Sequence, residues 1–504
     1  MFESSPQDNH VPRFANFYDG KSVFVTGASG FIGAVLLETL LRCCPGIKSI
    51  YILLRSKKNV QPEARKEQIF NRKLFEKFKE ETPEILKKVR VISGDASLPK
   101  LGMNEEDIQL LVDEVSVVFH CAADINFIKP LQFVLTNNVL SVSSVIELCR
   151  QMRKFEALVY TSTAYSNSNH LNLSIKEEIH RLPIRAEKFL DALKNEDNEM
   201  LQELIARCKP DWPNSYTFSK CLAENVIMDT ASDLPVAIIR PSVVISTWKH
   251  PMPGYVEGNS GLTALSLGVG KGFIKVAYAD PHCKVNLVPA DIVANSHVLA
   301  AWSVGTKRSA SPLIVNCTAT ESLDVKFSEH NESLTELVRE FPLPQSFAQP
   351  QNLIIVPYKY LYYILAAYYH YLPAIFLDGM LRILGKKPRV YSLYRFLDTV
   401  MSSVNFFLFR NFEFERKNME FLDKLIHQED RKDLALDFRD ATILRMTLSI
   451  PEVCPFYDWK IDRKSKSQRQ RIMYMRHMLI TGIQGIFLMT CCLFIYWAFS
   501  LIFR

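Results

Sequence analysis

The stretch that decides the fold is Lys21-Ser22-Val23-Phe24-Val25-Thr26-Gly27-Ala28-Ser29-Gly30-Phe31-Ile32-Gly33. Its apolar first half predicts a buried strand, and the apolar spacing after it predicts a helix. Gly27 allows a tight turn, Gly30 lets the backbone approach a phosphate, and Gly33 lets the helix pack closely on the strand. A strand, a glycine turn and a helix N-terminus in this order predict a dinucleotide site. The predicted cofactor contacts are Thr26, Gly27, Ser29, Gly30, Phe31, Ile32 and Gly33.

Five further apolar runs have the length and composition of buried strands. They occupy residues 50–54, 89–95, 115–120, 157–161 and 235–239. Segments with helical spacing separate them, for example 138–149 and 219–230. Continuous apolar strands that alternate with helices are typical of a parallel sheet covered on both faces. This pattern therefore predicts a Rossmann-type, doubly wound α/β fold for residues 21–320.

Composition and charge narrow the class of protein. The chain has 504 residues, of which 48% are apolar and 23% charged, so it is globular and is neither disordered nor fibrous. Its net charge of +6 resides in one short segment, Lys460 to Arg476, with seven basic residues and one acidic residue. Since a nucleic-acid binder usually spreads basic residues over a folded face, no nucleic-acid partner is predicted.

The eleven cysteines are scattered and show no spacing typical of a metal site, so no metal is predicted. Their odd number argues against a complete set of disulfides. Reduced thiols in a protein that faces the cytosol are the expected state.

The C-terminus predicts a membrane anchor. From Leu479 to Phe503 the sequence carries no charge, and this run is long enough to span a bilayer as a helix. The basic segment before it favours the cytoplasmic side, so the body of the protein is expected to face the cytosol. A second apolar stretch at 353–384 is rich in tyrosine and includes prolines and charges; it fits an interfacial or re-entrant helix pair as well as a span.

The end of the second strand indicates which nicotinamide cofactor is used. NAD enzymes usually have an acidic residue there, whereas this chain has Arg55 followed by Ser56, Lys57 and Lys58. A guanidinium suits a 2′-phosphate, so NADPH is predicted over NADH. Asp95, after the third strand, is assigned to the cofactor as an adenine contact, or it caps a turn.

A candidate catalytic group lies further along the chain. Tyr216 and Lys220 are spaced i and i+4, on one face of a predicted helix. A nearby ammonium favours the phenolate, so the tyrosine could exchange a proton with a carbonyl or alkoxide near neutral pH. Ser162 and Thr163 end the fifth strand, where a hydroxyl could bind the reacting carbonyl.

Together these motifs resemble the extended branch of the short-chain dehydrogenase/reductase superfamily. The resemblance makes Tyr216 the proton donor and Lys220 both its tuner and the anchor of the nicotinamide ribose. Thr163 becomes the hydrogen-bond donor to the carbonyl, with Ser162 as the alternative. Pro241 and Ser242 fall in the segment beside the nicotinamide.

Several stretches resemble alcohol-forming fatty acyl-CoA reductases more closely, and the similarity covers nearly the whole chain. They include residues 24–33, 52–55, 119–123, 162–165, 214–220, 240–242 and 253–256, and in the C-terminal part 370–374 and 385–388. The chain departs from many members at Tyr255, where tryptophan is usual. The resemblance implies that a long- or very-long-chain acyl-CoA is reduced to a fatty alcohol and free CoA by two hydride transfers.

The predicted organisation follows from these motifs. It comprises an N-terminal arm (1–20), the NADP-binding reductase domain (21–320), a helical domain (350–460), a basic segment (460–478) and a transmembrane helix (479–503). An insertion at 166–212, with helices near 186–193 and 200–205, is expected to cover the acyl-thioester site. The expected partners are acyl-CoA and the bilayer of the endoplasmic reticulum or the peroxisome, and a homodimer is compatible with the sequence.

Three other functions remain open at this point. A membrane-anchored hydroxysteroid dehydrogenase would share Tyr216 and Lys220 but would need no CoA site. An aldehyde-forming reductase would stop after one hydride transfer. A catalytically inactive Rossmann scaffold would bind a lipid at the membrane without chemistry.

Overall fold

The computed structural model describes residues 13–169, 174–208, 212–258, 261–307, 311–344, 346, 351–443, 446, 450 and 466–502. The chain forms two compact units, each made of segments that are separate in sequence. Unit 1 comprises Met1–Val256, Asn286–Leu323 and Phe412–Ala441. Unit 2 comprises Glu257–Val285, Asp324–Asn411 and Thr442–Arg504.

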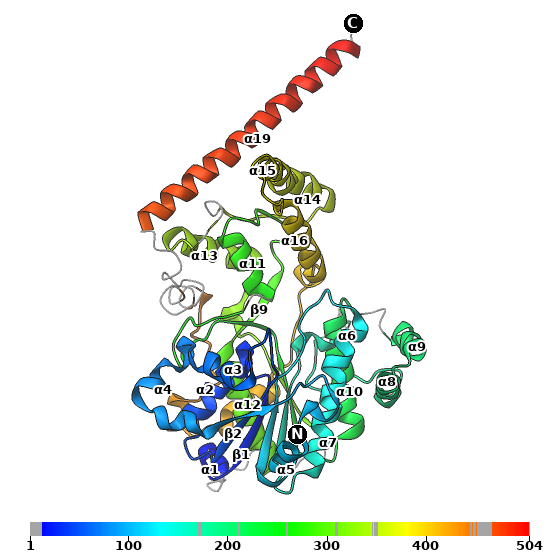
Figure 1. The fold of residues 1–504 in the computed structure, drawn as a ribbon, viewed down its shortest axis with the longest axis vertical. Coiled ribbons are helices and arrows are strands. Elements are labelled where there is room, and N and C mark those ends of the chain that lie inside the picture. Colours follow the sequence, from blue (N-terminus) through cyan, green and yellow to red (C-terminus); the bar gives the residue numbers. More distant parts are fainter. Residues whose placement is uncertain are drawn as a thin grey trace. The chain divides into compact units, whose positions relative to one another are not determined.

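Unit 1 is built on a seven-stranded sheet in the order β10-β6-β5-β4-β1-β2-β3 (Figure 1). The pairings along it are parallel. Its strands are β1 (Ser22–Thr26), β2 (Ser49–Leu54), β3 (Val89–Ser93), β4 (Val115–His120), β5 (Ala157–Thr161), β6 (Val236–Pro241) and β10 (Leu313–Cys317). The strand order reverses between β1 and β4, and ligands of such sheets bind where the carboxyl ends of the strands meet that point. The predicted parallel α/β sheet is confirmed.

Helices cover both faces of this sheet, because every residue of β1, β2, β4, β5 and β6 is buried. On one face α2 (Phe31–Cys43) packs against α12 (Ala290–Thr306). On the other, α5 (Glu105–Glu114), α7 (Ser141–Gln151) and α10 (Ser215–Thr230) share a core with the strands. Figure 1 shows the two layers of helices on either side of the strands.

The insertion is part of this core. Its helices α8 (Ala186–Lys194) and α9 (Asn198–Cys208) confirm the two that the sequence predicts. The ring of Phe189 packs edge-on against Phe218 of α10 at 6.1 Å. The insertion therefore packs on the helix that carries the candidate catalytic tyrosine.

The remaining elements of unit 1 are short. They are α1 (Phe14–Tyr18), α3 (Pro62–Phe70), η1 (Lys73–Phe75), α4 (Glu76–Glu81), η2 (Pro83–Lys88), η3 (Pro99–Gly102), α6 (Leu131–Leu135), the π-helical η4 (Thr136–Leu140), η5 (Ala164–Asn167), β7 (Val243–Ile245), η6 (Glu321–Leu323), α17 (Lys417–Leu425) and η9 (Asp430–Lys432). Strand β9 (Lys284–Pro289) contains the sequence boundary between the units.

Unit 2 is mainly helical. It contains α11 (Gly261–Gly270), β8 (Val276–Tyr278), β11 (Asp324–Lys326), α13 (Phe327–Glu340), β12 (Ile354–Val356), α14 (Lys359–Ala366), the π-helical η7 (Ala367–Tyr371), α15 (Leu372–Ile383), α16 (Val390–Val404), η8 (Phe407–Phe409) and α19 (Lys466–Ile502). Strands β8 and β12 form a parallel pair beneath α14.

Within the described residues, three helices are long and apolar enough to cross a membrane by length and composition. The first, Leu131–Gln151, contributes to the core of unit 1, which accounts for its apolar character. The second is Lys359–Ile383 and the third is Gln470–Thr490, within α19. Residue 503, the last of the predicted anchor at 479–503, lies outside the described part of the chain.

Candidate active site

The glycine turn joins β1 to α2 as the sequence predicts. Gly27 has a φ of +76°, which only glycine adopts readily, and a Cβ there would lie 2.6 Å from the amide nitrogen of Ala122. A Cβ on Gly33 would lie 2.2 Å from the carbonyl oxygen of Gly27. Gly30 is the N-cap of α2 and provides no side-chain cap. The first amides of α2 thus stay available, and the cradle fits a dinucleotide pyrophosphate.

Among the other predicted residues of the turn, Thr26 holds it in place through hydrogen bonds. The Thr26 hydroxyl lies 2.7 Å from Nδ1 of His120 and accepts a hydrogen bond from the Ala122 amide at 3.3 Å. Phe31, in the first turn of α2, packs its ring 6.3 Å from that of Tyr255. The next residue, Ile32, is partly exposed.

Three arginines gather beside this turn. Arg65 of α3 donates to the Ser29 hydroxyl at 3.1 Å and to the Arg55 carbonyl oxygen at 2.7 Å. Arg72 donates to the Ser29 carbonyl oxygen at 2.7 Å. Burial, followed by repulsion from Arg55 and Arg72, lowers the pKa of Arg65. Like charges held together at a phosphate cradle fit an anionic group. Reasoning from the sequence missed Arg65 and Arg72, although both follow Arg55 within the next helical segments.

Arg55 itself forms an ion pair with Asp95, with 2.9 Å between Nη1 of Arg55 and Oδ2 of Asp95. Asp95 also accepts hydrogen bonds from the Ser97 amide and hydroxyl. Burial opposes ionisation, but the hydrogen bonds from Arg55 and Ser97 hold the pKa of Asp95 below its ordinary value. The structure therefore brings these two predicted cofactor residues together at the ends of β2 and β3.

Tyr216 and Lys220 lie on α10, which begins with an effective cap. The Asn214 side chain accepts a hydrogen bond from the Thr217 amide at 2.9 Å. The Lys220 ammonium donates to the Thr161 carbonyl oxygen at 2.6 Å and to the Tyr160 hydroxyl at 3.2 Å. Its nitrogen lies 6.0 Å from the centroid of the Tyr216 ring. The predicted pair therefore sits one helical turn apart, joined to the carboxyl end of β5.

Burial acts on both members of this pair. It lowers the pKa of Lys220 to about 7 and raises the pKa of Tyr216 above its ordinary value. For Tyr216 this is the opposite direction to the shift that the lysine alone would cause. A phenol that keeps its proton at neutral pH is suited to donate that proton to a strongly basic alkoxide.

The two hydroxyls after β5 have different environments. Ser162 donates to Glu224 at 2.5 Å, and Glu224 is paired at 2.6 Å with Arg240; both of these ionic side chains are buried. The Thr163 hydroxyl lies 3.4 Å from the Pro241 carbonyl oxygen and accepts a weak hydrogen bond from the Tyr165 amide. Ser162 thus belongs to a buried ionic network, whereas Thr163 makes only long contacts.

The segment after β6 supplies a further polar group. The backbone amide of Ser242 donates to the Cys317 carbonyl oxygen at 3.0 Å. The buried Ser242 hydroxyl has no hydrogen-bond partner within the described chain. An unsatisfied buried hydroxyl after Pro241 fits contact with a ligand.

The two ends of the insertion at 166–212 meet close to Thr163 and Tyr216. The indole nitrogen of Trp212 donates to the Ser166 carbonyl oxygen at 2.8 Å. Ser166 follows Thr163 by three residues, and Trp212 precedes Tyr216 by four. The hydrogen bond therefore joins the two ends of the insertion next to the candidate catalytic residues.

His120 and Cys121 have structural partners. His120 is buried between Thr26 and Ser141, at 2.7 Å and 3.3 Å, and burial lowers its pKa to about 3. Burial raises the pKa of Cys121 to about 11, so its thiol is protonated at neutral pH and is a poor nucleophile.

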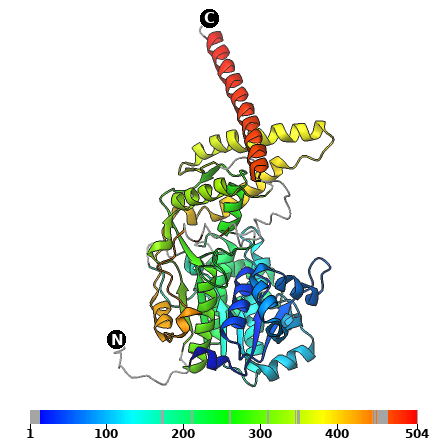
Figure 2. The ribbon, with the colours of Figure 1, turned by 90° about the vertical axis from the view of Figure 1, so that its left-hand side faces the viewer.

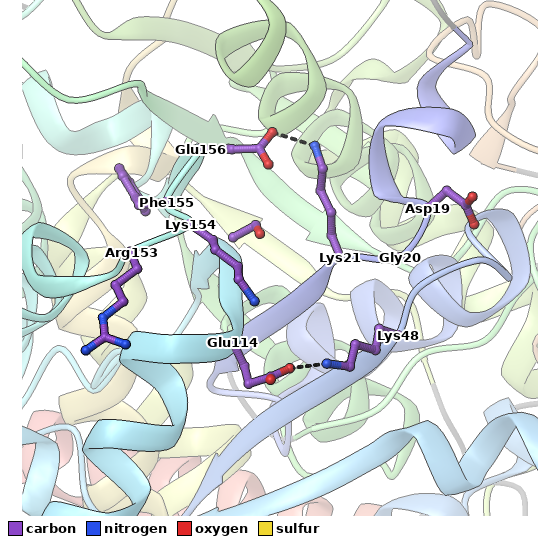
Figure 3. Close-up of a pocket in the computed structure, with 10 residues that line it drawn as sticks. Asp19, Gly20, Lys21, Lys48, Glu114, Arg153, Lys154, Phe155 and Glu156 are labelled. Carbon is purple, nitrogen blue, oxygen red and sulfur yellow. Dashed lines mark hydrogen bonds and ion pairs between the residues drawn. The ribbon is translucent and has the colours of Figure 1, made fainter.

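A cavity of about 480 Å³ lies elsewhere in unit 1 (Figure 3). It is lined by residues at the starts of β1, β4 and β5, among them Lys21, Glu114 and Glu156. Figure 3 shows Lys21 directed at Glu156 and Lys48 at Glu114, so these charges neutralise each other. The cavity is at the amino ends of the strands, opposite the glycine turn, and does not belong to the candidate active site.

Comparisons with known proteins agree with this geometry. Two family models, both described as male sterility protein, match residues 25–297 and 369–445. The chain is 34% identical to fatty acyl-CoA reductase 1 of Xenopus laevis over 84% of this chain and 82% of that protein. It is 34% identical to fatty acyl-CoA reductase 2 of Homo sapiens over 93% of this chain and 91% of that protein.

Solved structures confirm the fold. The terminal R domain from the myxalamid PKS-NRPS biosynthetic pathway superposes with a TM-score of 0.53 at 19% identity, over 86% of this chain and 90% of that one. The reductase domain of a nonribosomal peptide synthetase from Mycobacterium tuberculosis gives 0.51 at 15% identity, over 87% and 94%. The family models and these relatives show that the chain belongs to the male sterility protein family and, within it, to the fatty acyl-CoA reductases.

Proposed function

We propose that this protein reduces long- or very-long-chain fatty acyl-CoA to a fatty alcohol and free CoA, with NADPH as the reductant. The observation that carries the proposal is the position of Tyr216 and Lys220. Their helix is joined to the carboxyl end of β5 through the Lys220–Thr161 hydrogen bond of 2.6 Å, beside Thr163. This arrangement lies in a chain that matches fatty acyl-CoA reductases over most of its length.

The arginine cluster supports NADPH rather than NADH. A 2′-phosphate at the end of β2 would lie near Arg55 and Arg65, whose guanidinium groups can form charge-assisted hydrogen bonds with it. Binding of the 2′-phosphate would relieve the repulsion among Arg55, Arg65 and Arg72, which gather beside Ser29. The first amides of α2 would hold the pyrophosphate, and Ser242 would contact the nicotinamide end.

The catalytic side chains have different tasks in the proposed mechanism. Bound NADPH supplies the hydride for each reduction. Thr163 and Tyr216 donate hydrogen bonds to the thioester oxygen and stabilise the negative charge that develops on it. Lys220 would hold the cofactor ribose, and its hydrogen bond to the Thr161 carbonyl oxygen fixes the orientation of α10. Collapse of the tetrahedral hemithioacetal anion would break the carbon–sulfur bond and release CoA as a thiolate, which would take a proton from water to become the free thiol.

The same residues serve the second reduction. Once a second NADPH had supplied hydride to the aldehyde, the phenol of Tyr216 would donate its proton to the alkoxide. The environment of Tyr216 supports this role, since burial keeps its proton in place until a stronger base forms next to it. We also propose that the insertion, which closes through Trp212 and Ser166, covers the acyl thioester.

The C-terminal helix supports a membrane location. We propose that residues 479–503 anchor the chain in the membrane of the endoplasmic reticulum or the peroxisome, with the catalytic unit in the cytosol. The apolar α19 is long enough to span a bilayer, and the basic segment precedes it.

The proposal is tested with detergent-solubilised full-length protein and a panel of acyl-CoAs of increasing length. The assay follows release of the CoA thiol with NADPH, and with NADH as the comparison. We expect thiol release with long chains, faster with NADPH. A failure to release thiol from any member of the panel, with cofactor binding intact, would instead favour a hydroxysteroid dehydrogenase or an inactive scaffold.

A further inference from the structure

One face of unit 2 exposes large apolar side chains. The continuous helix formed by α14, η7 and α15 leaves Tyr360 84% exposed and Ile383 87% exposed. The start of α16 also exposes large apolar side chains. The exposed apolar residues here are Tyr358, Tyr360, Leu361, Tyr363, Ile364, Ile375, Phe376, Met380, Ile383, Leu384, Tyr391, Leu393 and Phe396. Such a patch is unusual on a soluble surface and marks an interaction site.

The opposite face of this helix is held by unit 2. His370 accepts hydrogen bonds from the amides of Lys275 and Val276, at 2.9 Å and 3.3 Å. Asp378 accepts three from the amides of Arg389, Val390 and Tyr391, which begin α16. These polar groups all face the protein, so the helix cannot cross a bilayer without losing them. It is a surface helix with one protein face and one apolar face.

Charge indicates what covers the apolar face. Residues 358–404 contain six basic residues and two acidic residues, Asp378 and Asp398, and both carboxylates accept hydrogen bonds from neighbouring groups of unit 2. Lys359, Arg382, Lys386, Lys387 and Arg389 are exposed. Basic residues around an apolar face that is rich in tyrosine complement the headgroups of an anionic bilayer.

The position of this helix relative to α19 also supports a bilayer as the partner of the apolar face. Figure 2 shows the α14–α15 helix lying across α19 rather than beside it. The two make contact, and Gln484 of α19 donates to the Tyr368 carbonyl oxygen at 3.3 Å. Since a helix that crosses a spanning helix runs in the plane of the membrane, the contact places α14–α15 at the membrane surface.

The depth of this contact agrees with an interfacial helix. Gln484 lies five residues beyond Leu479, which is about 8 Å along the helix axis at 1.5 Å per residue. Interfacial helices bury their apolar face about 5–10 Å into the boundary between headgroups and acyl chains. The amide of Gln484 would otherwise be unsatisfied in lipid, and the Tyr368 carbonyl, in the irregular η7, satisfies it.

We propose that α14, η7, α15 and the start of α16 form a second membrane contact, which lies in the plane of the cytosolic leaflet of an anionic bilayer. The proposal rests on the proposed function only in taking α19 as the anchor that sets the membrane normal. It adds a surface that holds unit 2 flat against the lipid, where long acyl chains reside.

The test uses the full chain in nanodiscs of phosphatidylcholine and phosphatidylserine. Nitroxide labels are placed on Ile364→Cys, on Leu488→Cys in the anchor and on Glu106→Cys, an exposed residue of α5, each with Cys491→Ala and Cys492→Ala. Collision rates with oxygen and with a water-soluble nickel complex are compared, and the signal of the parent without an added cysteine is subtracted. We expect the ratio of oxygen to nickel collisions at Ile364 to be several-fold higher than at Glu106.

The three labels separate the ways in which the idea could be wrong. A ratio at Ile364 equal to that at Glu106, with Leu488 in lipid, would overturn the second contact and leave the anchor intact. Low collision rates with both reagents at Ile364 would mean that protein, such as a second copy of the chain, covers the face. If Leu488 behaves like Glu106, the anchor itself is wrong.

Discussion

The ammonium of Lys220 donates a hydrogen bond of 2.6 Å to the backbone carbonyl oxygen of Thr161. This bond joins α10 to the carboxyl end of β5. Tyr216 precedes Lys220 by one helical turn, and Thr163 follows Thr161 by two residues. One buried cation therefore fixes the two groups that are proposed to bind the reacting oxygen.

Burial of this cation predicts a dependence of stability on pH. The pKa of Lys220 is lowered to about 7, from the value of 10.5 expected in the unfolded chain. Between these values the unfolded chain binds more protons, so this group makes the free energy of unfolding rise with pH. We expect the free energy of unfolding of the parent, minus that of Lys220→Met, to increase from pH 7 to pH 9. Denaturant unfolding in detergent measures both values. A difference that does not change with pH would contradict this.

The close contact between Gly33 and Gly27 predicts a selective loss of cofactor binding. In Gly33→Ala the added Cβ would meet the Gly27 carbonyl oxygen at 2.2 Å, so the turn must move. We expect a loss of stability of about 1–3 kcal/mol, typical of overpacking, together with weaker binding of NADPH in a titration. Gly379→Ala is the control, because its Cβ would meet nothing within 4 Å. If Gly33→Ala and Gly379→Ala bound NADPH equally well, the glycine turn would not be the pyrophosphate site.

Arg65 should determine the preference for NADPH. Removing a charged hydrogen bond to a phosphate costs about 1.5–3 kcal/mol, so Arg65→Ala should raise the KM for NADPH about 10- to 100-fold. The KM for NADH should change little. Lys66→Ala is the matched control on the same helix, since Lys66 pairs with Glu63. A similar rise for both cofactors would show that Arg65 supports the turn rather than the 2′-phosphate.

The two hydroxyls after β5 should separate into a catalytic and a structural residue. Thr163→Val should lower kcat about 100-fold or more, the cost of one donor to a developing oxyanion. Ser162→Ala should leave kcat within a few-fold and reduce stability by about 1–3 kcal/mol, because buried Glu224 loses a hydrogen bond. Measurements of kcat and of the free energy of unfolding test both variants. A large loss of kcat in Ser162→Ala, with little change in Thr163→Val, would make Ser162 the catalytic hydroxyl.

The local features of the fold could be predicted from the sequence. Apolar runs predict β1 to β6, and the glycines of the first turn predict the cradle, because each signal lies within a few neighbouring residues. The pair Tyr216 and Lys220 is also local, since one helical turn separates them. The insertion helices α8 and α9 follow from apolar spacing in the same way.

Contacts between distant segments could not be predicted. The approach of Arg65 to Ser29 joins residues 36 positions apart and depends on the direction of α3. The role of Ser162 depends on Glu224, which lies on another element. Residues 412–441 return to unit 1, where Asn418 donates to the Ile314 carbonyl oxygen at 2.7 Å, and no periodicity in the sequence indicates this.

One site is proposed to reduce the thioester twice, and a count of the products tests this sequence of two reductions most directly. The measurement follows NADPH oxidation, free thiol and lipid product together in one reaction of the full-length protein. We predict two NADPH consumed for each thiol released, with fatty alcohol as the product. Tyr216→Phe should lower this turnover about 10²- to 10⁴-fold while cofactor binding persists. One NADPH per thiol with accumulating aldehyde would show that the enzyme stops after one reduction, and full activity in Tyr216→Phe would show that Tyr216 is not the proton donor.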